Sequence, residues 1–152
     1  MPAVTLVHDM DANQETVWNA WADFGNIAEF HPGLKGSRII RGPETGQGAT
    51  RVCEQQDGTE INERITVFEP HSKIGWVLEN PPKPLKEGVV TVKMDNQGPG
   101  KTRVTMEFEV KMGMGPLGPI IYNLVAKNMI TKNLTKVLSA LNKHLTEKET
   151  AR

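Results

Sequence analysis

Three ionisable residues of this sequence are the candidates for binding a polar group or for moving a proton: His31, Arg51 and Glu63. Histidine titrates near neutral pH, a carboxylate can accept a proton, and a guanidinium can stabilise developing negative charge. Arg51 and Glu63 lie in segments where apolar and polar residues alternate, as in β-strands, and His31 lies between Phe30 and Pro32. We expect Glu63 to pair with Arg51, and His31 to lie close to both at the mouth of a cavity.

The expected surroundings of this polar cluster follow from the alternation of side chains along a strand. If Glu63 faces the interior, Arg64 faces solvent and the inward set is mostly apolar, with Arg51, Gln55 and Glu63 as its exceptions. The apolar members are Cys53, Ile61, Ile65, Val67, Trp76, Leu78, Val90, Val92, Met94, Val104, Met106, Phe108 and Val110. A lone buried carboxylate is costly, which favours its pairing with arginine. A register shifted by one residue would instead leave Glu63 in water among other strand charges.

The other candidates for chemistry have simpler interpretations. His31 could gate the cavity or act as a general base, or it could only cap a turn. Cys53, in the middle of a predicted strand, is interpreted as a small inward apolar residue rather than a nucleophile. The histidines are scattered without metal-ligand spacing, and no serine lies in G-x-S-x-G. We therefore expect no metal and no cofactor, and His31 and Glu63 are the candidates if the protein is catalytic.

The segment 113–118 spells G-x-G-x-x-G between a predicted strand and a predicted helix, a pattern found in dinucleotide-binding loops. The context does not fit, because no parallel strand follows the terminal helix and Pro116 removes a backbone donor that would face a pyrophosphate. We interpret the segment as a flexible hinge that lets the last helix swing over the cavity.

The elements that position these residues follow from periodicity and turn signals. The predicted strands are 4–9, 35–41, 49–56, 59–68, 73–79, 88–95 and 102–112. Between the first two strands, Asp11 or Asn13 can cap a helix that includes Phe24 and ends at Gly25, and a single-turn helix follows over 26–30. Short turns join the later strands, which predicts an antiparallel meander.

Residues 117–148 are predicted to form one long amphipathic helix with a kink near Pro119. Its apolar stripe comprises Ile121, Leu124, Val125, Ile130, Leu134, Val137, Leu138, Leu141 and Leu145. Tyr122, Ala126, Met129 and Asn133 follow one edge of the stripe and could face the open end of the cavity, although the same spacing is equally compatible with core packing. Residues 147–152 are expected to form a frayed tail.

These elements predict an α+β fold with a single domain over 1–152. A seven-stranded curved antiparallel sheet would wrap the long C-terminal helix, with two short helices between the first and second strands. One helix cannot fill the concave side of such a sheet, so an internal, mostly apolar cavity is expected. The residues predicted to bind its ligand are His31, Arg51, Gln55, Glu63, Trp76, Leu78, Val90, Met106, Phe108, Tyr122, Met129 and Asn133.

Short motifs spread over almost the whole chain carry a family resemblance. They are 11–18 (DANQETVW), 22–24 (ADF), 30–32 (FHP), 48–51 (GATR), 61–65 (INERI) and 101–105 (KTRVT). Together they resemble the START-like, or SRPBCC, superfamily, and its polyketide cyclase/dehydrase branch in particular. The resemblance implies a helix-grip fold, an inward-facing Glu63, hydrophobic-ligand binding for most relatives and catalysis for a few. Plant abscisic-acid receptors are similar in plan, but turns 56–59 and 80–84 do not match their gating loops.

The composition bears on partners and location. Eighteen basic and eighteen acidic residues give a net charge of zero, so bulk electrostatics offers no reason to expect nucleic acid or an anionic membrane as partner. No segment reaches the ~18 consecutive apolar residues of a membrane span, and the first residues lack the apolar stretch of a signal peptide. Together with a single cysteine, these features predict a cytoplasmic protein.

The sequence thus predicts binding of a hydrophobic small molecule, such as a lipid or polyketide, in the cavity. An alternative is a cyclase, dehydratase or isomerase-type enzyme in which His31 or Glu63 moves a proton and Arg51 stabilises negative charge. A third hypothesis is an interaction protein that uses the long helix or an exposed face formed by Trp18 and Trp21. The identity of the ligand and the oligomeric state stay open.

Overall fold

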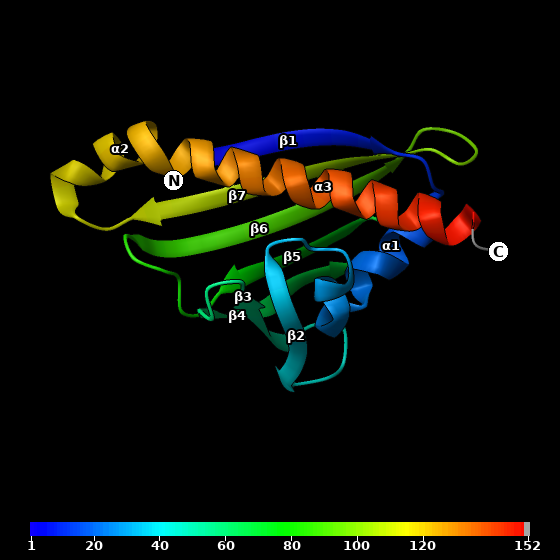
Figure 1. The fold of residues 1–152 in the computed structure, drawn as a ribbon, viewed down its shortest axis with the longest axis horizontal. Helices are drawn as coiled ribbons and strands as arrows, with labels where there is room; N and C mark the ends of the chain where they lie inside the picture. Colours follow the sequence, from blue (N-terminus) through cyan, green and yellow to red (C-terminus); the bar gives the residue numbers. More distant parts are fainter. Residues whose placement is uncertain (151–152) are drawn as a thin grey trace.

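The computed structural model of the chain describes residues 1–150, which form a curved sheet and a long helix. The sheet has seven antiparallel strands in the order β1-β7-β6-β5-β4-β3-β2. The strands are β1 (Ala3–Met10), β2 (Leu34–Arg41), β3 (Thr50–Gln55), β4 (Glu60–Glu69), β5 (Lys73–Leu78), β6 (Leu85–Asn96) and β7 (Thr102–Met112). Figure 1 shows the helix α3 (Lys127–Thr150) running along the sheet, while β2 curls round at the opposite edge from β1. The predicted α+β helix-grip arrangement is confirmed.

Two short helices separate β1 from β2, as predicted. The first, α1 (Gln14–Ala22), begins at Asn13, whose side-chain oxygen accepts a hydrogen bond from the backbone N–H of Thr16 at 2.8 Å. It ends earlier than the sequence pattern indicates, because Asp23 leaves the helical conformation (ψ 65°). Phe24 therefore begins the second helix, η1 (Phe24–Glu29), a 3₁₀ helix that starts two residues before the single-turn helix predicted over 26–30.

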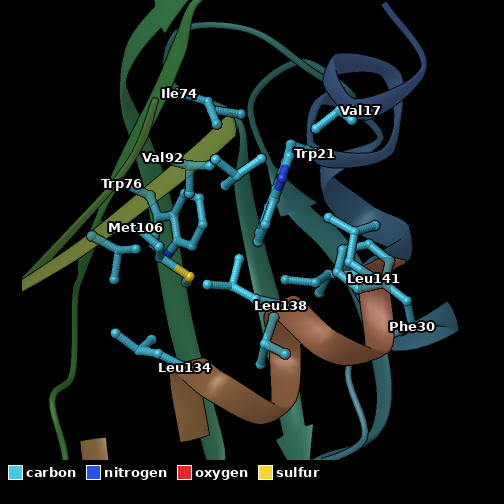
Figure 2. Close-up of a cluster of buried hydrophobic side chains, with 14 of the residues drawn as sticks. Val17, Trp21, Phe30, Ile74, Trp76, Val92, Met106, Leu134, Leu138 and Leu141 are labelled. Atoms are coloured by element: carbon cyan, nitrogen blue, oxygen red, sulfur yellow. The ribbon is translucent and has the colours of Figure 1, made fainter. Parts of the chain in front are cut away.

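The aromatic face of α1 is buried against the sheet. The rings of Trp18 and Phe68 lie with centroids 5.0 Å apart, and Trp21 lies 6.0 Å from Trp76 of β5. Figure 2 shows Trp76 on the sheet side of this core and Trp21 on the α1 side, with Leu138 of α3 beneath the two rings. An interaction function that needs the Trp18–Trp21 face exposed therefore loses its basis.

A β-bulge corrects one part of the predicted alternation. The register between β4 and β5 shifts between Ile65 and Val67, so that Val67 pairs with Gly75 and Phe68 pairs with buried Ile74. Phe68 packs into the core in the position expected for Val67. The bulge adds one residue to β4 and reverses the faces beyond it, which simple alternation cannot anticipate.

The last helical segment differs from the single predicted helix in its first half. It begins with η2 (Gly115–Leu117) and α2 (Gly118–Ile121), passes through a π-helical turn, η3 (Tyr122–Ala126), and continues as α3. The segment is therefore irregular at η3 as well as at the change from 3₁₀ to α-helix beside Pro119. A π turn holds an extra residue and rotates the faces that follow.

This rotation overturns the predicted apolar stripe in the first half of the segment. Leu124 is 71% exposed and Val125 52% exposed, whereas the stripe is buried from Ile130 to Leu145. Residues 147–150 belong to α3, contrary to the expected frayed tail, and 151–152 lie outside the described residues. Within the described part of the chain, no helix has the length and apolarity to cross a bilayer.

Candidate functional site

A buried ion pair joins β3 and β4. The register of the two strands places Arg51 directly opposite Glu63, and the side chain of Arg51 donates from Nε to Glu63 Oε1 at 2.8 Å. The Arg51 side chain is only 1% exposed, whereas that of Glu63 is 15% exposed. The predicted pairing is therefore present, and the two partners differ in exposure: the arginine is sealed in the core, and the carboxylate keeps a small exposed area.

The guanidinium of Arg51 is held by aromatic and backbone groups as well as by Glu63. Its central carbon lies 3.7 Å from the centre of the Phe24 ring and 4.7 Å from that of Trp76. Nη1 donates to the backbone carbonyl of Phe24 at 3.0 Å. Cation–π contacts and hydrogen bonds of this kind offset part of the cost of removing a charge from water.

Three donors converge on the carboxylate of Glu63. Besides Arg51, the thiol of Cys53 donates to Oε1 at 3.3 Å and the indole nitrogen of Trp76 donates to Oε2 at 3.2 Å. Burial raises the pKa of the Cys53 thiol, and the negative charge of Glu63 raises it further. Cys53 is thus a neutral hydrogen-bond donor, which agrees with its interpretation as a buried residue rather than a nucleophile.

His31 lies in a pocket between the β2 side of the sheet and α3. The pocket has a volume of about 150 Å³ and is lined by His31, Pro32, Gly33, Asn133 and Lys136. Burial lowers the pKa of His31 to about 4; the charge of Glu63 acts to raise it and that of Arg51 to lower it further. No hydrogen bond joins His31 to either residue among those that the structure describes.

The tautomer of His31 follows from its one hydrogen bond. Its Nδ1 accepts from the backbone N–H of Gly33 at 3.1 Å. An accepting nitrogen carries no proton, so in the neutral ring the proton resides on Nε2. At neutral pH the Nε2 atom of His31 therefore carries a proton. It can donate a hydrogen bond but cannot accept a proton from a substrate.

An apolar surface continues from the polar pair across β5, β6 and β7. Leu78 and Phe108 are half-buried, and Gly88 lies between them: a Cβ added there would be 3.2 Å from Leu78 Cδ2 and 3.3 Å from Phe108 Cε1. Sequence reasoning missed Gly88, although a glycine at an inward position of a strand commonly marks a close approach. It also missed Phe24, which it placed only within a helix, and Lys136.

The remaining predicted site residues differ in their burial and surroundings. Trp76, Val90, Met106 and Tyr122 are buried in the core, whereas Gln55 is half-buried at the end of β3. Asn133 is exposed and lines the His31 pocket, and Met129 is 58% exposed and does not line it. The structure thus brings Arg51, Glu63 and Trp76 into contact, groups Asn133 with His31, and leaves Met129 apart. No cluster of metal-ligating side chains occurs among the side chains that the structure describes.

Comparisons with known proteins agree with this architecture. The model of the family described as "Polyketide cyclase / dehydrase and lipid transport" matches residues 1–146. A search of curated proteins gives no significant sequence match.

Solved structures resemble the whole chain at low sequence identity. The aromatase/cyclase Zhui from Streptomyces is 16% identical with a TM-score of 0.78, covering 97% of this chain and 94% of its own. The protein XoxI from Bacillus cereus is 18% identical with a TM-score of 0.79, over 98% of this chain and 99% of its own. A START superfamily protein from Mycobacterium smegmatis is 16% identical with a TM-score of 0.74, over 95% and 97%. At these identities the likeness establishes the fold.

Proposed function

The chain belongs to the polyketide cyclase/dehydrase and lipid transport family, and on this premise we propose that it binds a hydrophobic small molecule against the concave face of its sheet. The Arg51–Glu63 pair anchors a polar group of the ligand, and the half-buried side chains of Leu78 and Phe108 contact its apolar body. A lipid, a polyketide or a similar metabolite meets this description. The expectation of a cytoplasmic location stays a prediction.

The observation that carries the proposal is the incomplete coordination of Glu63. A carboxylate offers about four lone-pair positions, two on each oxygen. Arg51 and Cys53 both donate to Oε1, and among the described residues Trp76 alone donates to Oε2. Oε2 therefore retains one acceptor position on a side chain that is 15% exposed. A ligand hydroxyl, which donates one hydrogen bond, fits this position.

His31 supplies the complementary group. Because Gly33 occupies Nδ1, the Nε2 proton of the neutral ring is available to a ligand carbonyl. The pocket at His31 measures about 150 Å³, whereas pockets for drug-sized ligands hold about 300–1,000 Å³. The ligand therefore extends beyond the pocket, or the last helix moves outward, as the predicted hinge at 113–118 would permit.

Native mass spectrometry of the protein purified from cells, followed by extraction and identification of any released molecule, tests the proposal. A discrete added mass is the expected result. Titration with the apolar dye Nile red then compares wild type with Gly88→Leu, in which the added side chain would crowd Leu78 and Phe108. Gly36→Leu is the matched control, because a side chain at Gly36 meets no atom within 4 Å.

We expect Gly88→Leu to weaken dye binding at least about tenfold, since the leucine side chain would push Leu78 and Phe108 out of their contacts with the ligand. Gly36→Leu should bind as wild type does. A protein that carries no added mass and whose Nile red affinity is the same with and without Gly88→Leu would contradict the proposal.

Catalysis of the cyclase, dehydratase or isomerase type is a second candidate, and the neutral, half-buried imidazole of His31 favours it. Donation from Nε2 would polarise a substrate carbonyl. Incubating the extracted molecule with wild type and with His31→Phe separates the two functions. Turnover that is lost in the variant while binding persists supports an enzyme, and recovery of the molecule unchanged from wild type supports a carrier.

A further inference from the structure

The segment from Met114 to Met129 exposes an unusual amount of apolar surface. Six of the nine large hydrophobic residues that are exposed in the described chain lie within it: Met114, Leu117, Ile120, Leu124, Val125 and Met129. Adjacent residues such as Leu124 and Val125 point in different directions from the helix axis, so the apolar surface wraps round the segment rather than forming one stripe. A single monomer rarely leaves such a concentration of apolar side chains in water without a function.

The charge around this segment is one-sided. From 111 to 146 the sequence contains Lys111, Lys127, Lys132, Lys136 and Lys143, and no aspartate or glutamate. Because the net charge of the chain is zero, the remainder carries a net charge of −5. Lys143 lies 3.9 Å from Glu147, and the other four lysines form no ion pair among the described residues. The zero net charge of the whole chain thus conceals a basic, apolar end.

We propose that the segment Met114–Met129, with the lysines in it and beside it (Lys111, Lys127 and Lys132), forms a docking surface for an anionic lipid bilayer. The apolar side chains enter the interface between head groups and acyl chains, and the lysines contact the anionic head groups. Figure 1 shows α2 at one end of the long axis of the molecule, where the segment can approach a flat surface without obstruction by α1. This contact is peripheral and is independent of whether the cavity holds a ligand.

A second copy of the chain fits this surface less well than a bilayer does. A symmetric dimer through the same face would bring the lysines of both copies together without any acidic partner from the segment. Anionic lipids neutralise these charges, and a fluid interface accommodates an apolar surface that wraps round a helix. The charge pattern therefore favours the membrane surface.

Co-sedimentation with vesicles tests the inference on the intact protein. The vesicles contain phosphatidylcholine with or without about 30% phosphatidylserine, and binding is repeated in about 1 M salt, where the Debye length falls to about 3 Å. The variants are Leu124→Asp and Lys127→Gln/Lys132→Gln. Their matched controls are Val7→Asp, an exposed apolar residue on β1, and Lys93→Gln, an exposed lysine on β6. All of these side chains are exposed, so the fold is preserved, which circular dichroism verifies.

Wild type should bind the vesicles that contain phosphatidylserine, and salt should weaken the binding. Each lysine removed should weaken it about fivefold, Leu124→Asp should weaken it at least about tenfold, and the two controls should have no effect. Absence of wild-type binding, or equal losses in the controls, would overturn the inference. So would a concentration-dependent dimer in analytical ultracentrifugation that Leu124→Asp dissociates, because the face would then belong to a second copy. None of these outcomes depends on the Gly88→Leu result, so ligand binding and membrane docking can fail separately.

Discussion

Replacing Glu63 by glutamine should destabilise the protein severely, although the two side chains have nearly the same shape. Arg51 is 1% exposed and cannot exchange its partner for water. With glutamine, the guanidinium keeps a hydrogen bond to a neutral oxygen but loses its attraction to a negative charge, which costs about 1 kcal/mol. If the glutamine oxygen stays on Arg51, its NH₂ group faces the indole N–H of Trp76, which loses its acceptor.

An unsatisfied buried donor costs about 1–3 kcal/mol, and together with the weakened contact this gives an expected loss of about 3 kcal/mol. That value is close to the 3–5 kcal/mol typical of removing one partner of a buried pair. Urea unfolding followed by tryptophan fluorescence measures it, since Trp21 and Trp76 lie in the same core. Glu60→Gln, at an exposed position of the same strand, is the control and should stay within about 0.5 kcal/mol of wild type.

A double-mutant cycle shows whether the loss belongs to the pair. Arg51→Met/Glu63→Gln should lose at least about 1 kcal/mol less than the sum of the two single variants, because residues in contact are not additive. If Glu63→Gln costs less than about 0.5 kcal/mol, the pair behaves as a surface ion pair, and both the burial argument and the proposed anchor would be refuted.

Three further predictions follow from the site and its supporting elements. His31 has a folded-state pKa of about 4, below its ordinary value of 6.5. Because the unfolded state therefore binds a proton at higher pH than the folded state, the free energy of unfolding should fall as the pH drops from about 6.5 to 4. His31→Gln should lose less stability than wild type over this interval, and urea midpoints at each pH measure the difference. Cys53 should resist alkylation by iodoacetamide at pH 8 in the native protein and react on unfolding, because its pKa is raised in the folded state. Mass spectrometry of the modified protein tests this, and rapid labelling of the native protein would contradict it. Asn13→Ala should cost about 1 kcal/mol, because the N–H of Thr16 loses its cap; an unchanged thermal midpoint would show that the cap contributes nothing.

The strands were predictable because each carries a local signal. Alternation and turn residues placed all seven strands within a few residues of their observed ends. The same alternation put Arg51 and Glu63 on one face, and the antiparallel meander made their pairing a reasonable hypothesis before the structure was known. The errors occur where the backbone departs from a regular repeat: at the bulge between Ile65 and Val67, and at the π turn over Tyr122–Ala126.

The sequence by itself determined the fold class, the elements and the set of polar residues that could face the interior, because periodicity and turn chemistry are local properties of the chain. Only the tertiary structure decided how those residues are used. The rings of Phe24 and Trp76 that enclose Arg51 come from distant elements. The low pKa of His31 arises from burial, which no local pattern encodes. Leu124 and Val125 lie in the π turn, where one extra residue changes which side chains face the sheet, so an apolar stripe that predicts core becomes surface.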